Sequence, residues 1–95
     1  MIVKKSKGVV TAPSKESSLI TYLSRGKEIG VATFDVDGKA KGTTKCKKII
    51  YITKGRGVVT YNGKEKKLSK SYVLILEEGT KFAVEGKLSA VVFNA

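Results

Sequence analysis

Residues 49–85, IIYITKGRGVVTYNGKEKKLSKSYVLILEEGTKFAVE, decide the fold of this chain. Runs of β-branched and aromatic residues alternate with turn-forming residues at intervals of about eight to twelve positions, as in antiparallel sandwiches and small barrels. The dipeptide Asn62-Gly63 predicts a type I′ turn, because both central positions of that turn need positive φ. A hairpin should therefore join a strand at 58–61 to a strand at 64–68.

Further turn signals extend the same pattern along the chain. Asp37-Gly38, Gly55-Arg56-Gly57 and Glu85-Gly86-Lys87 each adjoin an apolar segment and predict the end of a strand. Residues 39–48 are polar and basic, and form either a loop or an exposed strand. We expect an all-β fold, a small antiparallel β-barrel or jelly-roll, with no helix.

The N-terminal quarter gives weaker signals. Residues 1–16 carry several lysines around a short apolar run, which predicts a loosely held basic arm with one edge strand. Residues 17–24 fit either a helical stripe or strand alternation, and we prefer a strand because Ile, Thr and Tyr favour pleated surfaces. We expect the arm at 1–16 and one barrel domain at 17–95. Whether residues 1–27 fold back on their own barrel or swap onto a partner stays open.

The residue inventory argues against common kinds of catalysis. The chain of 95 residues contains no histidine and eight carboxylates, so the usual general base and the imidazole-based metal sites are missing. The lone Cys46 excludes an internal disulfide and is expected to be a buried or loop thiol. No apolar run approaches the ~20 residues that span a bilayer. We expect an intracellular protein that is not an enzyme and does not enter membranes.

The net charge of +11 comes from seventeen lysines and two arginines. Such a charge favours acidic partners through attraction that salt weakens. Lysine lacks the bidentate fork that reads bases, so DNA binding should be weak and non-specific, and lysines also keep sheet edges from pairing. The lysines that could contact DNA or another acidic partner are Lys39, Lys41, Lys45, Lys47, Lys48, Lys64, Lys66 and Lys67.

Three predicted strands, at 49–52, 73–76 and 90–93, are apolar on both faces. In a small barrel the outer face of such strands would be an exposed apolar patch, which predicts self-association unless the N-terminal arm covers it. Ile50 and Ile52 should face inward and Ile49 and Tyr51 outward. The predicted homodimer interface consists of Ile49, Tyr51, Leu74, Leu76, Val91 and Phe93.

Residues 51–63 resemble the central segment of cupins, where an apolar strand runs into a Gly-x-Gly turn and an Asn/Asp-Gly hairpin. Residues 71–86 keep the spacing of the second cupin motif, G-x5-P-x-G-x2-H-x3-N. The resemblance covers residues 28–95 and implies a metal-free cupin without a cofactor, because residues that cannot bind a metal ion occupy the family's ligand positions. These residues are Gly42, Thr44, Lys48 and Phe82.

Among metal-free cupins, the chain most resembles the C-terminal domain of the centromere protein C family. The similarity lies in the Gly30-Val31-Ala32-Thr33-Phe34 strand before Asp37-Gly38 and in the last apolar strand at 90–93. It departs at Leu76-Glu77-Glu78-Gly79, where cupins commonly have an apolar-Pro-Pro-Gly corner. The resemblance implies a non-catalytic homodimerisation module of a nuclear, centromeric kinetochore scaffold, with other kinetochore or chromatin proteins as further partners.

Two alternatives belong to other classes of protein. A stand-alone, cytoplasmic cupin could bind a small anionic ligand in its lumen through Thr44, Lys48 and Tyr61. Inward-facing Ile50, Ile52 and Phe82 argue instead for a filled interior. The second alternative is a basic domain that contacts DNA or chromatin through the lysines named above.

Overall fold

Seven strands paired in antiparallel fashion form one folded sheet in the computed structural model, which describes residues 9–14, 17–25 and 29–94. For residues 9–14, 18–25 and 29 only the backbone is described. The described part of the chain contains no helix, and so none with the length and hydrophobicity needed to cross a membrane. The predicted all-β class is confirmed. The strands are β1 (Val9–Ser14), β2 (Ser17–Arg25), β3 (Ile29–Thr43), β4 (Lys48–Tyr61), β5 (Lys64–Ser69), β6 (Val73–Leu76) and β7 (Lys81–Asn94).

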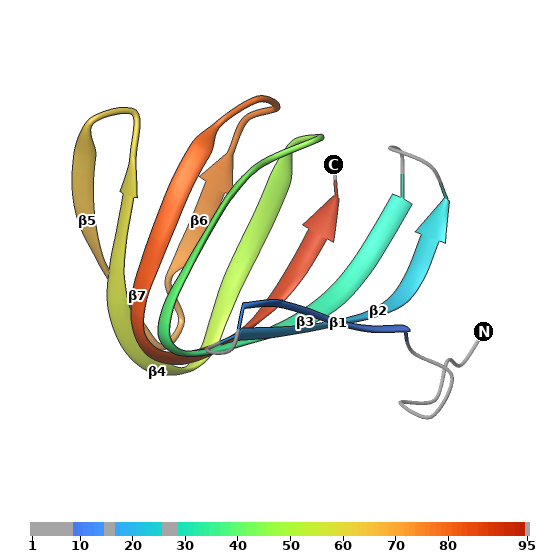
Figure 1. The fold of residues 1–95 in the computed structure, drawn as a ribbon, viewed down its shortest axis with the longest axis horizontal. Coiled ribbons are helices and arrows are strands. Elements are labelled where there is room, and N and C mark those ends of the chain that lie inside the picture. The colour runs from blue at the N-terminus through green and yellow to red at the C-terminus, as the bar shows by residue number, and fades with distance from the viewer. Residues whose placement is uncertain (1–8, 15–16, 26–28, 95) are drawn as a thin grey trace.

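The strand order is β1-β2-β3-β7-β4-β5, and β6 also pairs with β4. Strand β4 pairs with β7 along most of its length, and on its other side it pairs first with β6 and then with β5. The long strands β3, β4 and β7 curve so strongly that the sheet folds into a U, as Figure 1 shows. The sheet is an open jelly-roll and does not close into a complete barrel.

The three predicted turns at Asp37-Gly38, Gly55-Arg56-Gly57 and Glu85-Gly86-Lys87 are wrong, because each lies inside a continuous long strand. They form the bend of the U, called the crease below. Gly38 pairs with Gly86, and Gly86 pairs with Gly57, so three glycines lie side by side across the strands. The residues read as turn formers bend the sheet instead of ending its strands.

The glycines of the crease allow a close backbone approach. A Cβ atom built on Gly57 would lie 2.5 Å from the carbonyl oxygen of Glu85, and one on Gly86 would lie 2.5 Å from the Cα atom of Gly57. Both distances are shorter than real Cβ contacts, and both neighbours are backbone atoms that cannot rotate away. The sharp bend therefore depends on the absence of side chains at these positions.

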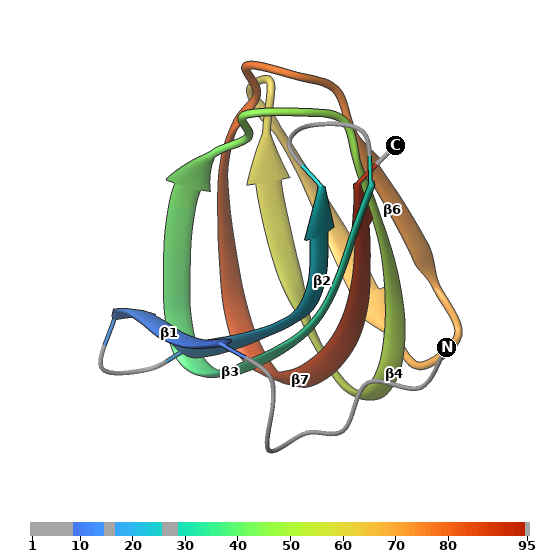
Figure 2. The same cartoon turned by 90° about the vertical axis from the view of Figure 1, so that its right-hand side faces the viewer.

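The crease divides the sheet into two arms. The large arm contains β1, β2 and β6, together with the first halves of β3 and β4 and the second half of β7. The small arm contains β5, together with the second halves of β3 and β4 and the first half of β7. Turned by 90°, the structure shows the long strands curving from one arm into the other around a central space (Figure 2). Residues 39–43, predicted as a loop or an exposed strand, are the end of β3.

The core lies between the arms. Ile52 and Val59 are fully buried, and Ile50 packs against the buried cluster, so the predicted inward face of β4 is confirmed. Leu74 and Leu76 were predicted at an outer interface, but they are buried in this core. Because side chains alternate along a strand, their neighbours Val73 and Ile75 face outward and are about half exposed.

The local predictions for hairpin and edge strands can be checked individually. Asn62 and Gly63 have φ values of 51° and 70°, and they join β4 to β5 as expected. Residues 17–25 form a strand, as preferred, and β1 pairs with β2 at the edge of the large arm. The loosely held arm at 1–16 and its packing on a partner stay predictions, because residues 1–8 and 15–16 lie outside the described part of the chain.

We expect Gly57→Ala to lower the free energy of unfolding by about 2–4 kcal/mol, because the new methyl group collides with the backbone of β7. Gly42→Ala is the matched control, since its Cβ would meet only the Phe82 ring, at an ordinary 3.6 Å. Urea unfolding followed by circular dichroism measures both. Equal stability of the two variants would contradict the role assigned to the crease.

Candidate ligand-binding lumen

A cavity of about 500 Å³ lies between the two arms, and we call it the lumen. Its walls are mainly the inward-facing side chains of β3, β4, β6 and β7, arranged in cross-strand rows. One row joins Val92, Ile50 and Leu74 across β7, β4 and β6 of the large arm. The expectation of a filled interior holds where Ile52 and Leu76 are almost fully buried, and the open space lies beyond them. The lining residues are Phe34, Lys41, Gly42, Thr43, Thr44, Lys45, Lys48, Ile50, Ile52, Leu68, Leu74, Leu76, Phe82, Val84, Leu88 and Val92.

Every ionisable group of the lining that carries charge at neutral pH is a lysine. Lys41, Lys45 and Lys48 belong to the wall, and no aspartate or glutamate does. They lie at or near the junction of β3 with β4, so the positive charge gathers at one end of the lumen. A cavity with apolar walls and cations at its rim favours ligands that combine an apolar body with a negative group.

Lys48 is held in place by the last strand. Its Nζ atom donates a hydrogen bond to Oδ1 of Asn94, which pairs with Lys48 across β4 and β7. Asn94 also pairs with Gly30 of β3, and a Cβ atom on Gly30 would collide with Nδ2 of Asn94. The side-chain amide of Asn94 therefore occupies the space that a side chain at position 30 would fill. This contact orients the Lys48 ammonium group at the rim.

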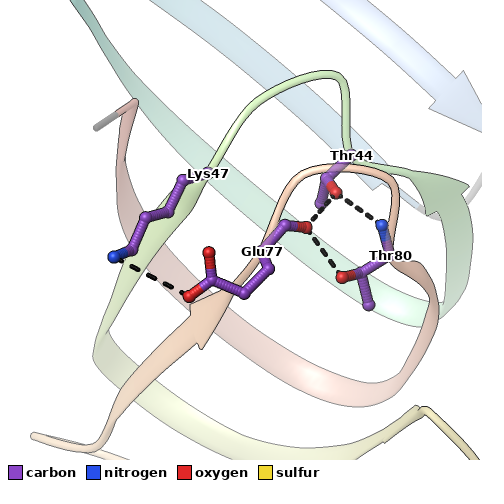
Figure 3. Close-up of polar contacts among 4 residues, drawn as sticks. All are labelled: Thr44, Lys47, Glu77 and Thr80. Atoms are coloured by element: carbon purple, nitrogen blue, oxygen red, sulfur yellow. Dashed lines mark hydrogen bonds and ion pairs between the residues drawn. The ribbon is translucent and has the colours of Figure 1, made fainter.

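Two loops that cross from one arm to the other are held together by polar contacts of Thr44, Lys47, Glu77 and Thr80 (Figure 3). Thr44, at the end of β3, donates a hydrogen bond from Oγ1 to the carbonyl oxygen of Glu77 at 2.6 Å, and its Oγ1 accepts one from the Thr80 backbone N–H at 2.9 Å. Thr80 Oγ1 donates to the same Glu77 carbonyl oxygen at 2.7 Å. Lys47 adds an exposed ion pair with the Glu77 carboxylate at 3.7 Å, which contributes little.

Backbone bonds complete this fastening. The Thr44 N–H donates to the carbonyl oxygen of Thr80 at 3.0 Å, and the Gly79 N–H donates to that of Thr44 at 2.9 Å. Thr44 and Thr80 are both buried, so these bonds replace water that the groups have lost. The loops at 44–47 and 77–80 therefore fix the separation of the arms at the lysine end of the lumen.

The four residues at the cupin metal-ligand positions, Gly42, Thr44, Lys48 and Phe82, make different contacts in the structure. Thr44 fastens the loops, Phe82 packs beside Gly42, and Lys48 bonds to Asn94. Among residues 9–14, 17–25 and 29–94 no three His, Cys, Asp or Glu side chains are grouped as a metal site would need. The absence of a bound metal and of a cofactor stays a prediction.

Of the residues proposed for a lumen ligand, Lys48 and Thr44 line the cavity, whereas Tyr61 is partly buried against the core and lies outside the lining. Asn94 was missed. Its only sequence signal is a polar residue after the apolar run at 90–93, and its partnership with Lys48 depends on a register between strands far apart in the chain.

The lysines proposed for DNA contact do not form one surface. Lys48 lies at the rim of the lumen and Lys45 and Lys47 lie on the adjacent loop. On the outer face of the small arm, Lys39 is paired in register with Glu85, and Lys67 faces Val58 on the next strand. Lys41 belongs to the lining of the lumen with Lys45 and Lys48, and Lys64 and Lys66 are exposed on β5.

A second hollow, of about 780 Å³, lies along the crease. Its lining mixes Asp35 and Asp37 with Lys54, Arg56 and Lys87. Asp35 already accepts a hydrogen bond from Ser89 Oγ at 2.5 Å, and Asp37 pairs in register with Lys87. Neighbouring charges of opposite sign make this a solvated surface rather than a site selective for one charge.

No family profile matches the sequence, and no curated protein is significantly similar to it. The fold, however, is shared with solved structures. Pac13 from Streptomyces, with uridine, has a TM-score of 0.84 at 13% identity over 97% of this chain and 78% of its own. KdgF from Halomonas sp. has a TM-score of 0.74 at 12% identity over 98% and 93%.

Hydroxypropylphosphonic acid epoxidase from S. wedmorenis has a TM-score of 0.81 at 13% identity, and the alignment covers all of this chain and 59% of that one. At such identities the likeness establishes the fold alone, which is that of the small cupin-like β-barrels. The predicted cupin resemblance is confirmed at this level. The similarity to the centromere protein C family finds no support among these structures.

The expectation that the chain is not an enzyme is wrong. Pac13 is described as a nucleoside dehydratase, and the epoxidase is an enzyme by name. The same fold carries catalysis in those proteins, so the residue inventory of this chain does not exclude an enzyme.

Thr44→Val should lower the free energy of unfolding by about 1–3 kcal/mol, because the buried carbonyl and N–H groups bonded to its hydroxyl lose a partner. Thr43→Val is the control, since Thr43 is exposed beside it. Differential scanning calorimetry measures both. A control as destabilised as Thr44→Val would show that the loop bonds contribute nothing specific.

The Cys46 thiol should react slowly with a thiol reagent in the native protein, because its side chain is only 7% exposed. Absorbance of the released reporter measures the rate, with the urea-unfolded protein as control. Equal rates in both states would contradict the buried position.

Proposed function

We propose that the lumen binds a small organic anion that has a flat, apolar body. The observation that carries the proposal is a cavity of about 500 Å³ whose charged lining residues are three lysines and no carboxylate. This volume lies in the range typical of small-molecule sites, about 300–1,000 Å³. An anionic group on the ligand would offset the charge that the lysines place at the rim.

The walls suggest the form of the ligand. Phe34 and Phe82 line the lumen, and aromatic faces favour contact with other flat rings. Lys48 supplies a point charge that suits a carboxylate or phosphate oxygen, and Asn94 keeps the ammonium group at the rim. The ring would lie among the apolar rows, with the anionic group at the lysine end.

A ring that carries a phosphate is the first class to test. One protein with this fold, Pac13, is known with uridine and is described as a nucleoside dehydratase. Uridine itself is neutral, whereas three lysines line the lumen of this chain. Uridine monophosphate therefore combines the ring of that ligand with the charge that this lumen requires.

The test compares uridine monophosphate with uridine by isothermal titration calorimetry. We expect the phosphate to tighten binding by about 10–100-fold, the value of one hydrogen bond to a charged group. Lys48→Met should remove most of this difference, while Lys54→Met, on an exposed residue outside the lining, should preserve it. Analysis of the mixtures by mass spectrometry would reveal whether the ligand is chemically changed.

If neither compound binds, aromatic carboxylates of similar size form the second panel with the same two variants. Failure of every anion to bind, or binding that Lys48→Met leaves unchanged, would overturn the proposal.

The role of a kinetochore dimerisation module in the nucleus is the less favoured alternative. It rests on the sequence resemblance, and the proteins that share the fold include enzymes acting on small molecules. Non-specific contact with DNA is weaker still, because the eight lysines lie on separate surfaces and one of them is paired in register with a glutamate.

A further inference from the structure

The outer face of the large arm carries two cross-strand rows of apolar side chains. One row joins Ile75, Ile49 and Phe93 across β6, β4 and β7, and the other joins Val73, Tyr51 and Val91. Val73, Ile75, Tyr51 and Phe93 are between 39% and 55% exposed. We call these six residues the outer patch. The predicted interface shared four of them, Ile49, Tyr51, Val91 and Phe93.

The outer patch contains no charge, although one residue in five of the chain is lysine or arginine. Strands β5 and β6, which pair with β4 on the side away from β7, differ in their charge. Strand β5, at the edge of the small arm, carries Lys64, Lys66 and Lys67, and lysines at an edge discourage pairing with other strands. Strand β6 reads Val-Leu-Ile-Leu and has no such protection. The large arm thus carries no charge within the outer patch or on β6.

The size of the patch fits half of a modest interface. Its four exposed members leave on the order of 400 Å² of side-chain surface in water, as large as the main patch of a typical monomer and often functional there. A standard interface needs about 800 Å² from each partner, of which the centre is apolar and the rim polar. The patch can supply that centre, and the polar residues around it can supply the rim.

We propose that the outer patch binds the outer patch of a second copy of this chain, so that two large arms pack face to face about a two-fold axis. An uncharged surface is self-complementary, as such an axis requires. Each copy carries a net charge of +11, so two copies repel one another at long range, and the patch adds no like charge to that repulsion. Association should therefore strengthen as salt rises, which is the reverse of binding to an acidic partner.

Sedimentation equilibrium of the full chain at low and high salt tests this proposal. We expect a dimer whose dissociation constant falls as salt is added. Ile75→Lys should weaken association by about 100-fold, because the axis brings two buried charges into one interface. Thr60→Lys is the control, since Thr60 is exposed on the small arm and adds the same charge outside the patch. Circular dichroism checks that both variants are folded.

A wild-type chain that stays monomeric at both salt concentrations would overturn the proposal, and would leave the patch to a different protein or to residues 1–8. A dimer that Ile75→Lys does not weaken would overturn it as well. Both outcomes are independent of the lumen, because Ile75 faces away from it and ligand titration of the same variant reports on the site separately.

Discussion

The close approach of three strands at the crease is the constraint on which the rest of the structure depends. Gly38, Gly86 and Gly57 lie side by side where β3, β7 and β4 bend, and the backbone atoms there leave no room for a Cβ on Gly57 or Gly86. A less sharp bend would spread the arms, open the core to water and separate the loops that Thr44 fastens. The crease at one end and the bonded loops at the other therefore set the volume of the lumen together.

Short-range signals predicted the all-β class, the Asn62-Gly63 hairpin and the inward face of β4. They failed at the crease because a glycine has the same local preferences in a turn and in a bend of a continuous strand. Only the alignment of the glycines across neighbouring strands distinguishes the two, and that alignment is a property of the register. The strand boundaries were therefore predicted less well than the strands themselves.

The same limit applies to the site. Leu74 and Leu76 were placed on the wrong face because a strand that is apolar throughout gives no alternation, and a shift of one residue exchanges its faces. Lys48 and Thr44 could be identified from the sequence because they occupy recognisable motif positions. Asn94 could not, because its contact with Lys48 bridges 46 positions of the chain and no local pattern announces it.

The first residues of β4 contribute to two surfaces, the lumen on one face of the strand and the outer patch on the other. Ile50 and Ile52 belong to the lumen, while Ile49 and Tyr51, which alternate with them, belong to the outer face. Because adjacent residues point in opposite directions, a substitution at one set leaves the surface of the other unchanged. Ligand preference and self-recognition can thus diverge independently in evolution, or be redesigned separately, within four consecutive codons of the gene.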